Sequence, residues 1–235
     1  MVNAEFIAWV VGMIEPSSQA AALDVGAGTG HLSRALAPRV KRLVAFDLTP
    51  QMLDRNKHLT EEAGLTNVSF QQGDTYALPF PDASFDLVTT QLTVHHFESP
   101  ERALSEIFRV CRPGRRVGVV DLVSPDEPAL AADYNRIERL RDPSHTTALT
   151  EAQLTQLVER SGFEVERTAS RESNISAGDW LDLSATPKDV RRDVIEEFRQ
   201  EAHGGPPTGM RAYLENERLM FRQRGVVVVA VKPSI

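Results

Sequence analysis

Three alternating glycines form the stretch of this chain that is best suited to bind a ligand. The sequence LDVGAGTGHL covers residues 23–32 and places Gly26, Gly28 and Gly30 directly after an apolar run. Glycine tolerates the φ angles of a tight turn and lets a ligand approach the backbone closely. The dinucleotide motif Gly-x-Gly-x-x-Gly would need a third glycine where this chain has His31. The loop therefore indicates a nucleotide-like ligand but disfavours a nicotinamide dinucleotide, and with it an oxidoreductase.

An aspartate stands at the end of each of three successive apolar runs, and these acids narrow the choice of ligand. Asp24 precedes the glycines, where it would repel a pyrophosphate and attract an ammonium or sulfonium group. Asp47 ends the second run, where a carboxylate can accept from both ribose hydroxyls and excludes a 2′-phosphate. Asp74 ends the third run, where it can accept from an adenine amino group. Each aspartate could instead cap a helix or a turn, but three in succession favour a cationic, phosphate-free nucleoside.

These residues need a sheet that brings strand ends together, and the first two thirds of the chain predicts one. Short β-branched runs alternate with segments of helical periodicity, which is typical of a doubly wound parallel sheet. Such sheets bind ligands beyond the carboxyl ends of their strands. We expect strands over 21–26, 42–47, 67–74, 84–91 and 115–123, and helices over 29–37, 50–63 and 99–111.

The last third of the chain has a different pattern, with long polar helical segments. We interpret residues 172–222 as a helical substrate-side insertion within a single domain over residues 1–235. The expected fold class is α/β, a doubly wound, seven-stranded, mostly parallel sheet with a helical insertion before the last strand. The further elements expected are helices within 124–145 and 149–162, and strands over 163–169 and 225–232.

Several longer motifs occur in order between Ala21 and Gly118. They are LDVGAGTGHLS, VAFDLTPQML, QQGDTYALPFPDASFDLVTT and TVHHFESPERALSEIFRVCRPGRRV. In order and spacing the chain resembles the class I S-adenosylmethionine-dependent methyltransferases, in particular their ubiquinone/menaquinone-biosynthesis-like small-molecule group. The resemblance implies the Rossmann-like methyltransferase fold and S-adenosylmethionine as the cofactor.

The resemblance also implies a role for each motif residue. The backbone at Gly26, Gly28 and Gly30 would approach the methionine part of the cofactor, and Asp24 would anchor its amino group, directly or through water. The other implied contacts are Asp47 to the ribose, Leu48 and Met52 to the adenine ring, Asp74 and the Thr75 backbone to the adenine amino group, and Gln91 to the methionyl group.

Three histidines are candidate bases for a methyl acceptor. His95 and His96 follow the fourth expected strand in QLTVHHF, and His145 follows the fifth in RDPSHTT. An imidazole has a pKa near neutrality and could take a proton from a hydroxyl or an activated carbon. Any of the three could instead hold a loop or cap a helix. The same strand exit lacks the Asn/Asp-Pro-Pro-Tyr signature, which disfavours nucleic-acid N-methylation, and no metal-ligand constellation is visible.

The expected insertion is rich in aromatic residues and methionine, which can line a pocket for an apolar small molecule. The same side chains could simply pack its helices together. They are Trp180, Phe198, Met210, Tyr213, Leu214, Met220 and Phe221.

The composition of the chain limits the kinds of partner that it can bind and the cellular compartment that it fits. The 235 residues carry a formal net charge of −7, which argues against adhesion to nucleic acid or to an anionic membrane. The single cysteine, Cys111, excludes an intrachain disulfide and fits a reducing cytoplasm. The apolar run 6–14 is too short to span a membrane and predicts an amphipathic helix packed on the domain. We expect a cytoplasmic monomer or homodimer.

These patterns together predict an enzyme. It would transfer a methyl group from S-adenosylmethionine to an oxygen or carbon of a small, apolar or aromatic metabolite. The alternative is a protein of the same fold that binds the cofactor and catalyses a rearrangement or cyclisation without methyl transfer, or that acts as a binding module. The glycine loop does not separate these two functions, because both retain the cofactor site.

Overall fold

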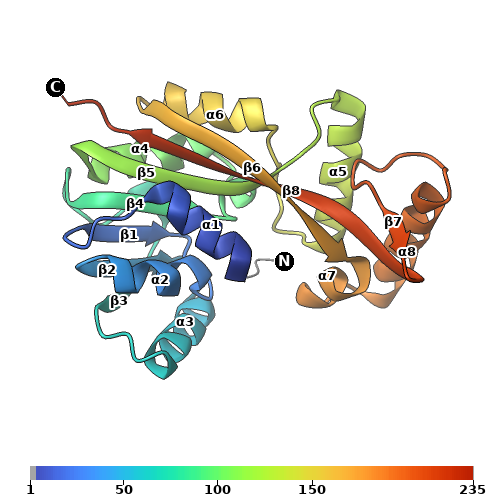
Figure 1. Ribbon diagram of the computed structural model, residues 1–235, viewed down its shortest axis with the longest axis horizontal. Coiled ribbons are helices and arrows are strands. Elements are labelled where there is room, and N and C mark those ends of the chain that lie inside the picture. The colour runs from blue at the N-terminus through green and yellow to red at the C-terminus, as the bar shows by residue number, and fades with distance from the viewer. Residues whose placement is uncertain (1–3, 235) are drawn as a thin grey trace. The chain divides into compact units, whose positions relative to one another are not determined.

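The computed structural model describes residues 4–234, and its strands form one mixed α/β sheet (Figure 1). The strand order is β3-β2-β1-β4-β5-β8-β6, and β7 pairs with β8. After β3 the chain returns to the middle of the sheet and places β4 against the free side of β1. This reversal is the doubly wound arrangement that the sequence predicts, and it puts a topological switch point beside β1.

The strands that precede the switch point and follow it run parallel. Val25 at the end of β1 pairs in register with Phe46 of β2 and with Thr90 of β4, so the carboxyl ends of these strands meet at one edge. That edge is where a doubly wound sheet binds its ligand. The strands are β1 (Ala21–Val25), β2 (Arg42–Asp47), β3 (Val68–Gln72), β4 (Phe85–Gln91) and β5 (Cys111–Val123).

The helices between these strands begin within two residues of the predicted positions. Pro50 occupies the first turn of one helix and Pro100 the first turn of another, where proline costs no hydrogen bond. The elements are α2 (His31–Leu36), η1 (Ala37–Arg39), α3 (Pro50–Glu62), η2 (Thr75–Ala77), η3 (Val94–His96) and α4 (Pro100–Val110).

Helix α1 (Ala4–Ile14) packs on this sheet, as the apolar run at residues 6–14 predicts. Val10 and Ile14 are fully buried, in one core cluster with Ala22 of β1 and Val227 of β8. Among the helices of residues 4–234, none is both long and apolar enough to cross a membrane.

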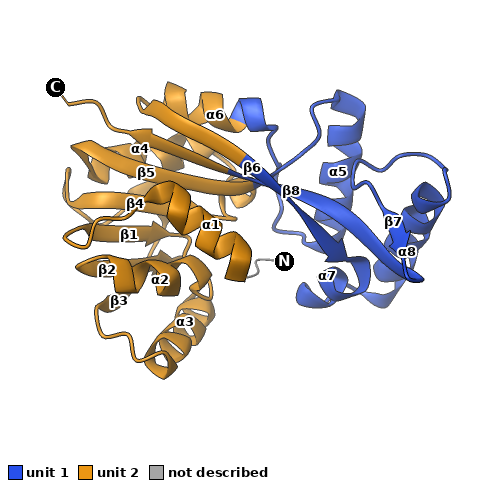
Figure 2. Ribbon diagram, viewed as in Figure 1, with its two compact units in different colours: residues 1, 122–153, 170–226 blue, residues 2–121, 154–169, 227–235 orange. Residues whose placement is uncertain are grey.

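The chain divides into two compact units (Figure 2). The nucleotide unit, as we name it, comprises residues 4–121, 154–169 and 227–234 of the described chain, and it holds β1–β4, most of β5 and the glycine loop. The insertion unit comprises residues 122–153 and 170–226. Strands β6 (Glu164–Ser176) and β8 (Arg218–Val231) and helix α6 (Glu151–Arg160) contribute residues to both units.

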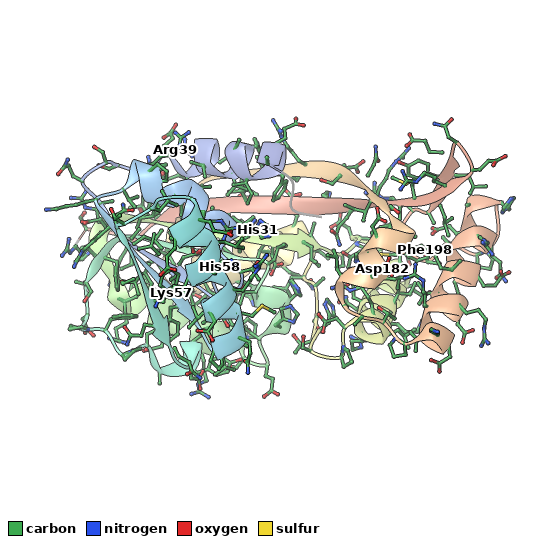
Figure 3. All side chains as sticks on the ribbon, turned by 90° about the horizontal axis from the view of Figure 1, so that it is seen from below. His31, Arg39, Lys57, His58, Asp182 and Phe198 are labelled. Atoms are coloured by element: carbon green, nitrogen blue, oxygen red, sulfur yellow. The ribbon has the colours of Figure 1, made fainter. Side chains whose placement is uncertain are left out.

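An aromatic cluster forms the core of the insertion unit. The ring of Trp180 lies 5.0 Å from that of Phe221 and 6.0 Å from that of Phe198, centroid to centroid, and all three side chains are buried. Figure 3 labels Phe198 on α8. These residues therefore pack the unit together, which is the second of the two interpretations that the sequence allows. The helices of this unit are α5 (Pro128–Arg141), α7 (Ala177–Leu183) and α8 (Lys188–Ala202).

The prediction of a helical segment across residues 208–222 is wrong. This segment instead holds the short strand β7 (Tyr213–Glu215), which pairs antiparallel with the start of β8. Asn216 and Glu217 connect the two strands, both with positive φ (48° and 63°). Two such residues make the type I′ turn whose twist matches that of a hairpin. The spacing of the apolar residues around the turn resembles helical periodicity, but the segment pairs as two antiparallel strands.

Candidate functional site

The glycine loop after β1 has a left-handed backbone at all three glycines. Gly26, Gly28 and Gly30 have φ of 66°, 52° and 82°. A Cβ on Gly26 would lie 2.3 Å from Cγ2 of Thr93, and one on Gly30 would lie 1.9 Å from Oδ1 of Asn56. A Cβ on Gly28 would meet no atom of the described residues within 4 Å. Two glycines are therefore required by packing, and the middle one borders open space.

Asp47 fixes the middle of this loop. Its Oδ2 accepts from the Gly28 N–H at 2.7 Å, and its Oδ1 accepts from the Thr49 N–H at 2.8 Å. A carboxylate has about four lone-pair directions, so these two bonds leave capacity for further donors. Asp47 ends β2 at the ligand edge of the sheet, where the sequence predicts an acceptor for ribose hydroxyls.

Asp24 is buried beneath the loop, with only 1% of its surface exposed. It accepts from Ser33 Oγ at 2.5 Å and from Thr89 Oγ1 at 2.9 Å, which ties β1 to α2 and to β4. Burial raises the pKa of Asp24 to about 6, although the hydrogen bonds from Ser33 and Thr89 act in the opposite direction. Its first role is therefore structural, and its predicted contact with a cofactor amino group stays a prediction.

The residues with predicted adenine contacts lie near the ends of β2 and β3. Leu48 and Met52 are large apolar side chains that remain 65% and 45% exposed, which is unusual enough to suggest a ligand surface. Asp74 is exposed and begins η2, where its Oδ1 accepts from the Tyr76 N–H at 2.9 Å. Thr75 is the first residue of η2 and is half-buried. Asp74 thus caps a turn, as the alternative interpretation allows, and still presents its carboxylate to solvent.

Gln91 ends β4 with a buried amide. Its Nε2 has no hydrogen-bond partner among residues 4–234. The next residue, Leu92, has a φ of 52°, a strained conformation for a residue with a side chain. Thr93 Oγ1 then lies 2.8 Å from the Gln91 carbonyl oxygen and 3.2 Å from that of Gly26. Strain and a buried donor without an acceptor both point to a binding function at this strand end.

His95 and Asp121 form a buried pair in the same unit. Nδ1 of His95 lies 2.5 Å from Oδ1 of Asp121, and the His95 backbone N–H donates to Oδ2 at 2.9 Å. Because a carboxylate oxygen accepts, Nδ1 is the donor in this pair. The ring of His96 lies beside that of His95, with centroids 4.1 Å apart. The pair has the arrangement of a base with an orienting carboxylate.

His145 belongs to the insertion unit and is 3% exposed. Its Nε2 lies 2.7 Å from Oδ1 of Asn135, which also accepts from the Ala148 N–H at 2.6 Å. Asn135 in turn donates to the Ala148 carbonyl at 3.2 Å. These bonds fasten the loop after α5, which is the loop-holding interpretation. A role for His145 as a base stays a prediction.

Sequence reasoning missed three residues of this site. Asp121 lies two residues before the end of β5 and is buried. It is thus another acid near the end of a parallel strand, and the pattern that identified Asp24, Asp47 and Asp74 could have identified it as well. Thr93 and Asn56 carry no such signal, because their role is to fill the space beside two glycines. His31, the residue that breaks the dinucleotide motif, begins α2 and is exposed (Figure 3).

The donors and acceptors at this edge fit S-adenosylmethionine. The open backbone at Gly28 admits the methionine part, and the amide of Gln91 lacks an acceptor that a carboxylate would supply. Asp47 offers an acceptor for ribose hydroxyls beside the exposed apolar surface of Leu48 and Met52. Among the described residues, no group of three or more His, Cys, Asp or Glu side chains is arranged to hold a metal ion.

Comparison with known proteins gives the same result. A family model described as a methyltransferase domain matches residues 23–118. The methyltransferase YcgJ of Bacillus subtilis is 33% identical over 173 residues, which are 74% of this chain and 68% of that protein. The crystal structure of YcgJ has a TM-score of 0.89 at 26% identity and covers 99% of this chain and 100% of its own. A demethylmenaquinone methyltransferase of Thermus thermophilus is 38% identical over 114 residues, 48% of this chain and 51% of that protein.

The packing of the glycine loop predicts a difference between two glycine-to-alanine variants. Gly28→Ala should lower the free energy of unfolding by about 1 kcal/mol, the strain of a left-handed alanine. Gly30→Ala adds a collision with the fully buried Asn56, and should cost about 2–4 kcal/mol. Urea unfolding of both variants measures this, and equal losses would contradict the packing described. Gly28→Ala should also weaken the binding of S-adenosylhomocysteine, because the methyl group of the alanine would occupy the open space that we assign to the ligand.

The raised pKa of Asp24 predicts a pH-dependent stability. The folded protein holds this proton up to about pH 6 and the unfolded chain only to about pH 4. The associated stability is therefore complete below about pH 4 and is lost as the pH rises through 6, a loss on the order of 2–3 kcal/mol. Asp24→Asn has no such proton, so urea unfolding between pH 4 and 7 should show the two proteins diverging over this window. Parallel curves would show that the pKa is not raised.

Proposed function

Because this chain belongs to the S-adenosylmethionine-dependent methyltransferases, we propose that it methylates an oxygen or carbon of a small apolar or aromatic acceptor. The observation that carries the proposal is the open backbone at Gly28 beside the carboxylate of Asp47. A nucleoside fits there through its ribose, whereas a bound phosphate would face two acids, Asp24 and Asp47. We propose the predicted set of cofactor contacts for this edge of the nucleotide unit.

The class of acceptor is inferred from relatives and from the site. The demethylmenaquinone methyltransferase of Thermus thermophilus is named for a quinone substrate, and this chain spans about half of that protein. A hydroxylated ring offers both a nucleophilic carbon and a nucleophilic oxygen, which are the two acceptor atoms proposed. Either atom becomes reactive when a neighbouring hydroxyl loses its proton.

His95 is the residue we propose as the base. S-adenosylmethionine, when bound, supplies an activated sulfonium methyl group. His95 would take the acceptor proton on Nε2, while the methyl group would pass from the bound cofactor to the acceptor carbon or oxygen. Asp121 holds the tautomer with the proton on Nδ1 and stabilises the imidazolium that forms. The remaining product is S-adenosylhomocysteine.

The ribose contact is tested by substitution of Asp47. Asp47→Ala removes an acceptor pair and should weaken the binding of S-adenosylhomocysteine well over tenfold, as measured by calorimetric titration. Asp47→Asn retains one acceptor oxygen and should give an intermediate affinity. Asp54→Ala, at an exposed position of α3, is the matched control and should bind normally. A normal affinity of Asp47→Ala would refute this site.

The base is tested with a reduced demethylmenaquinone and a panel of phenols as acceptors. Methyl transfer should give S-adenosylhomocysteine and methylated product in equal amounts; binding of the cofactor without either product would favour the rearrangement or binding functions. His95→Gln should lower kcat by about 10²–10⁴-fold. Its affinity for S-adenosylhomocysteine should stay unchanged.

Two further variants separate catalysis from packing. Asp121→Asn should lower kcat with little effect on KM, because it disturbs the tautomer of His95 and leaves the acceptor surface in place. His96→Gln changes the neighbouring ring and should retain kcat within about tenfold. If His95→Gln and His96→Gln lose activity equally, the assignment of the base to His95 is wrong.

A further inference from the structure

The insertion unit contains a cavity of about 260 Å³ that the methyl-transfer site does not use. It lies among the segment after β5, helix α5, strand β6, the end of α8 with residues 207–211, and strand β8. This volume is below that of a typical drug-sized pocket, so it suits a small molecule. The charged residues that line it are Asp126, Glu172, Glu201, Arg211, Arg222 and Arg224.

Two of the three acids are occupied by the protein itself. Glu201 accepts from the backbone N–H groups of Thr208 and Ala212 and from the Thr208 hydroxyl. Glu172 pairs with Arg211 at 2.5 Å. The third acid, Asp126, has a side chain that is 75% exposed and comes no closer than 4.0 Å to the Arg224 guanidinium. The three acids equal the three arginines in number, but only Arg211 has an acid of the lining in close contact.

Arg222 and Arg224 are the two arginines of the lining that lack a close ion pair among the described residues. They lie two residues apart on β8, so their side chains leave the same face of the strand. The guanidinium of Arg222 lies over the ring of Tyr213 and forms no ion pair within residues 4–234. The guanidinium of Arg224 lies 4.0 Å from the carboxylate of Asp126 and 3.6 Å from that of Glu151, which are long distances for ion pairs. A bound anion could therefore accept hydrogen bonds from Arg222 and from Arg224 without breaking a close ion pair.

The cavity already accommodates one carboxylate. The hydrogen bond from Arg211 lowers the pKa of Glu172, and the charges of Arg222 and Arg224 lower it further. The positive field of the three arginines thus converges on a carboxylate. Because Glu172 and Asp126 would repel a doubly charged phosphate more strongly, a monoanionic ligand fits better.

The rest of the wall is apolar. Val123, Leu130 and Pro207 line the cavity together with the ring of the buried Tyr134. Gly209 closes one side, where an added Cβ would lie 2.4 Å from the Leu130 carbonyl oxygen. A ligand with an apolar body would therefore lose water-exposed surface on this wall while its charge meets the arginines.

We propose that this cavity binds a small organic carboxylate, with its charge between Arg222 and Arg224 and its apolar body against Leu130 and Pro207. A guanidinium recognises a carboxylate through paired hydrogen bonds, and two guanidiniums on one strand face can share one ligand. This proposal goes beyond methyl transfer and does not depend on which acceptor is methylated.

The test uses 2-naphthoate as the probe and its neutral isostere 2-naphthamide as the matched ligand, titrated calorimetrically into the full chain. The carboxylate should bind at least tenfold more tightly than the amide, and added salt should weaken only the carboxylate. Equal binding of the two ligands would overturn the proposal.

Substitutions on β8 assign the binding to this cavity. The double variant Arg222→Gln/Arg224→Gln should lose about 10- to 100-fold of the 2-naphthoate affinity. Arg218→Gln, which removes the same charge from the same strand outside the cavity, should lose none. Asp126→Asn should tighten binding, because it removes a like charge, and misfolding cannot produce that result. Asp47→Ala should leave the affinity unchanged. Unchanged affinity in the double variant, or weaker binding by Asp126→Asn, would refute the site.

Discussion

The nucleotide unit depends on the hydrogen bond from the Gly28 N–H to the Asp47 carboxylate. The chain leaves β1 through three left-handed glycines, and within this loop the Gly30 N–H donates to the Ala27 carbonyl at 2.9 Å. Thr93 and Asn56 hold the two outer glycines by contact, and Asp47 holds the middle one by charge. The loop is thus fixed from β2, β4 and α3 while its central peptide stays open to a ligand. Such preorganisation reduces the ordering cost of binding.

Two aspartates one strand apart show how environment divides their roles. Asp24 is surrounded by Ser33 and Thr89 beneath the loop, and its pKa of about 6 reflects the cost of a buried charge. Asp47 lies at the ligand edge of the sheet, where its carboxylate accepts hydrogen bonds from the backbone N–H groups of Gly28 and Thr49. The first acid therefore joins the secondary-structure elements, and the second joins the loop to whatever donors arrive. A change in the charge of Asp24 would therefore act on the loop through β1, α2 and β4.

The sequence allowed the nucleotide unit to be predicted in detail. Strand ends, helix starts at proline and the glycine loop are local signals, and a parallel sheet turns their order into positions along one edge. The pairing of His95 with Asp121 escaped prediction because 26 residues separate the two, and only the register of β4 and β5 brings them together. The hydrogen bond between His145 and Asn135 likewise joins two residues that no local motif links. Residue type indicates chemistry, but only packing shows whether that chemistry is already satisfied.

The insertion unit was predicted less well for a physical reason that also explains its cavity. The turn at Asn216 and Glu217 folds β7 onto β8, and the Arg222 N–H then donates to the Met210 carbonyl at 3.2 Å. This pairing places Arg211 beside Arg222, while β6 brings Glu172 to the pair from a distant part of the sequence. A helix over the same residues would have scattered these charges around its surface. The cluster of Arg211, Arg222 and Arg224 therefore depends on the hairpin, and no local sequence motif predicts it.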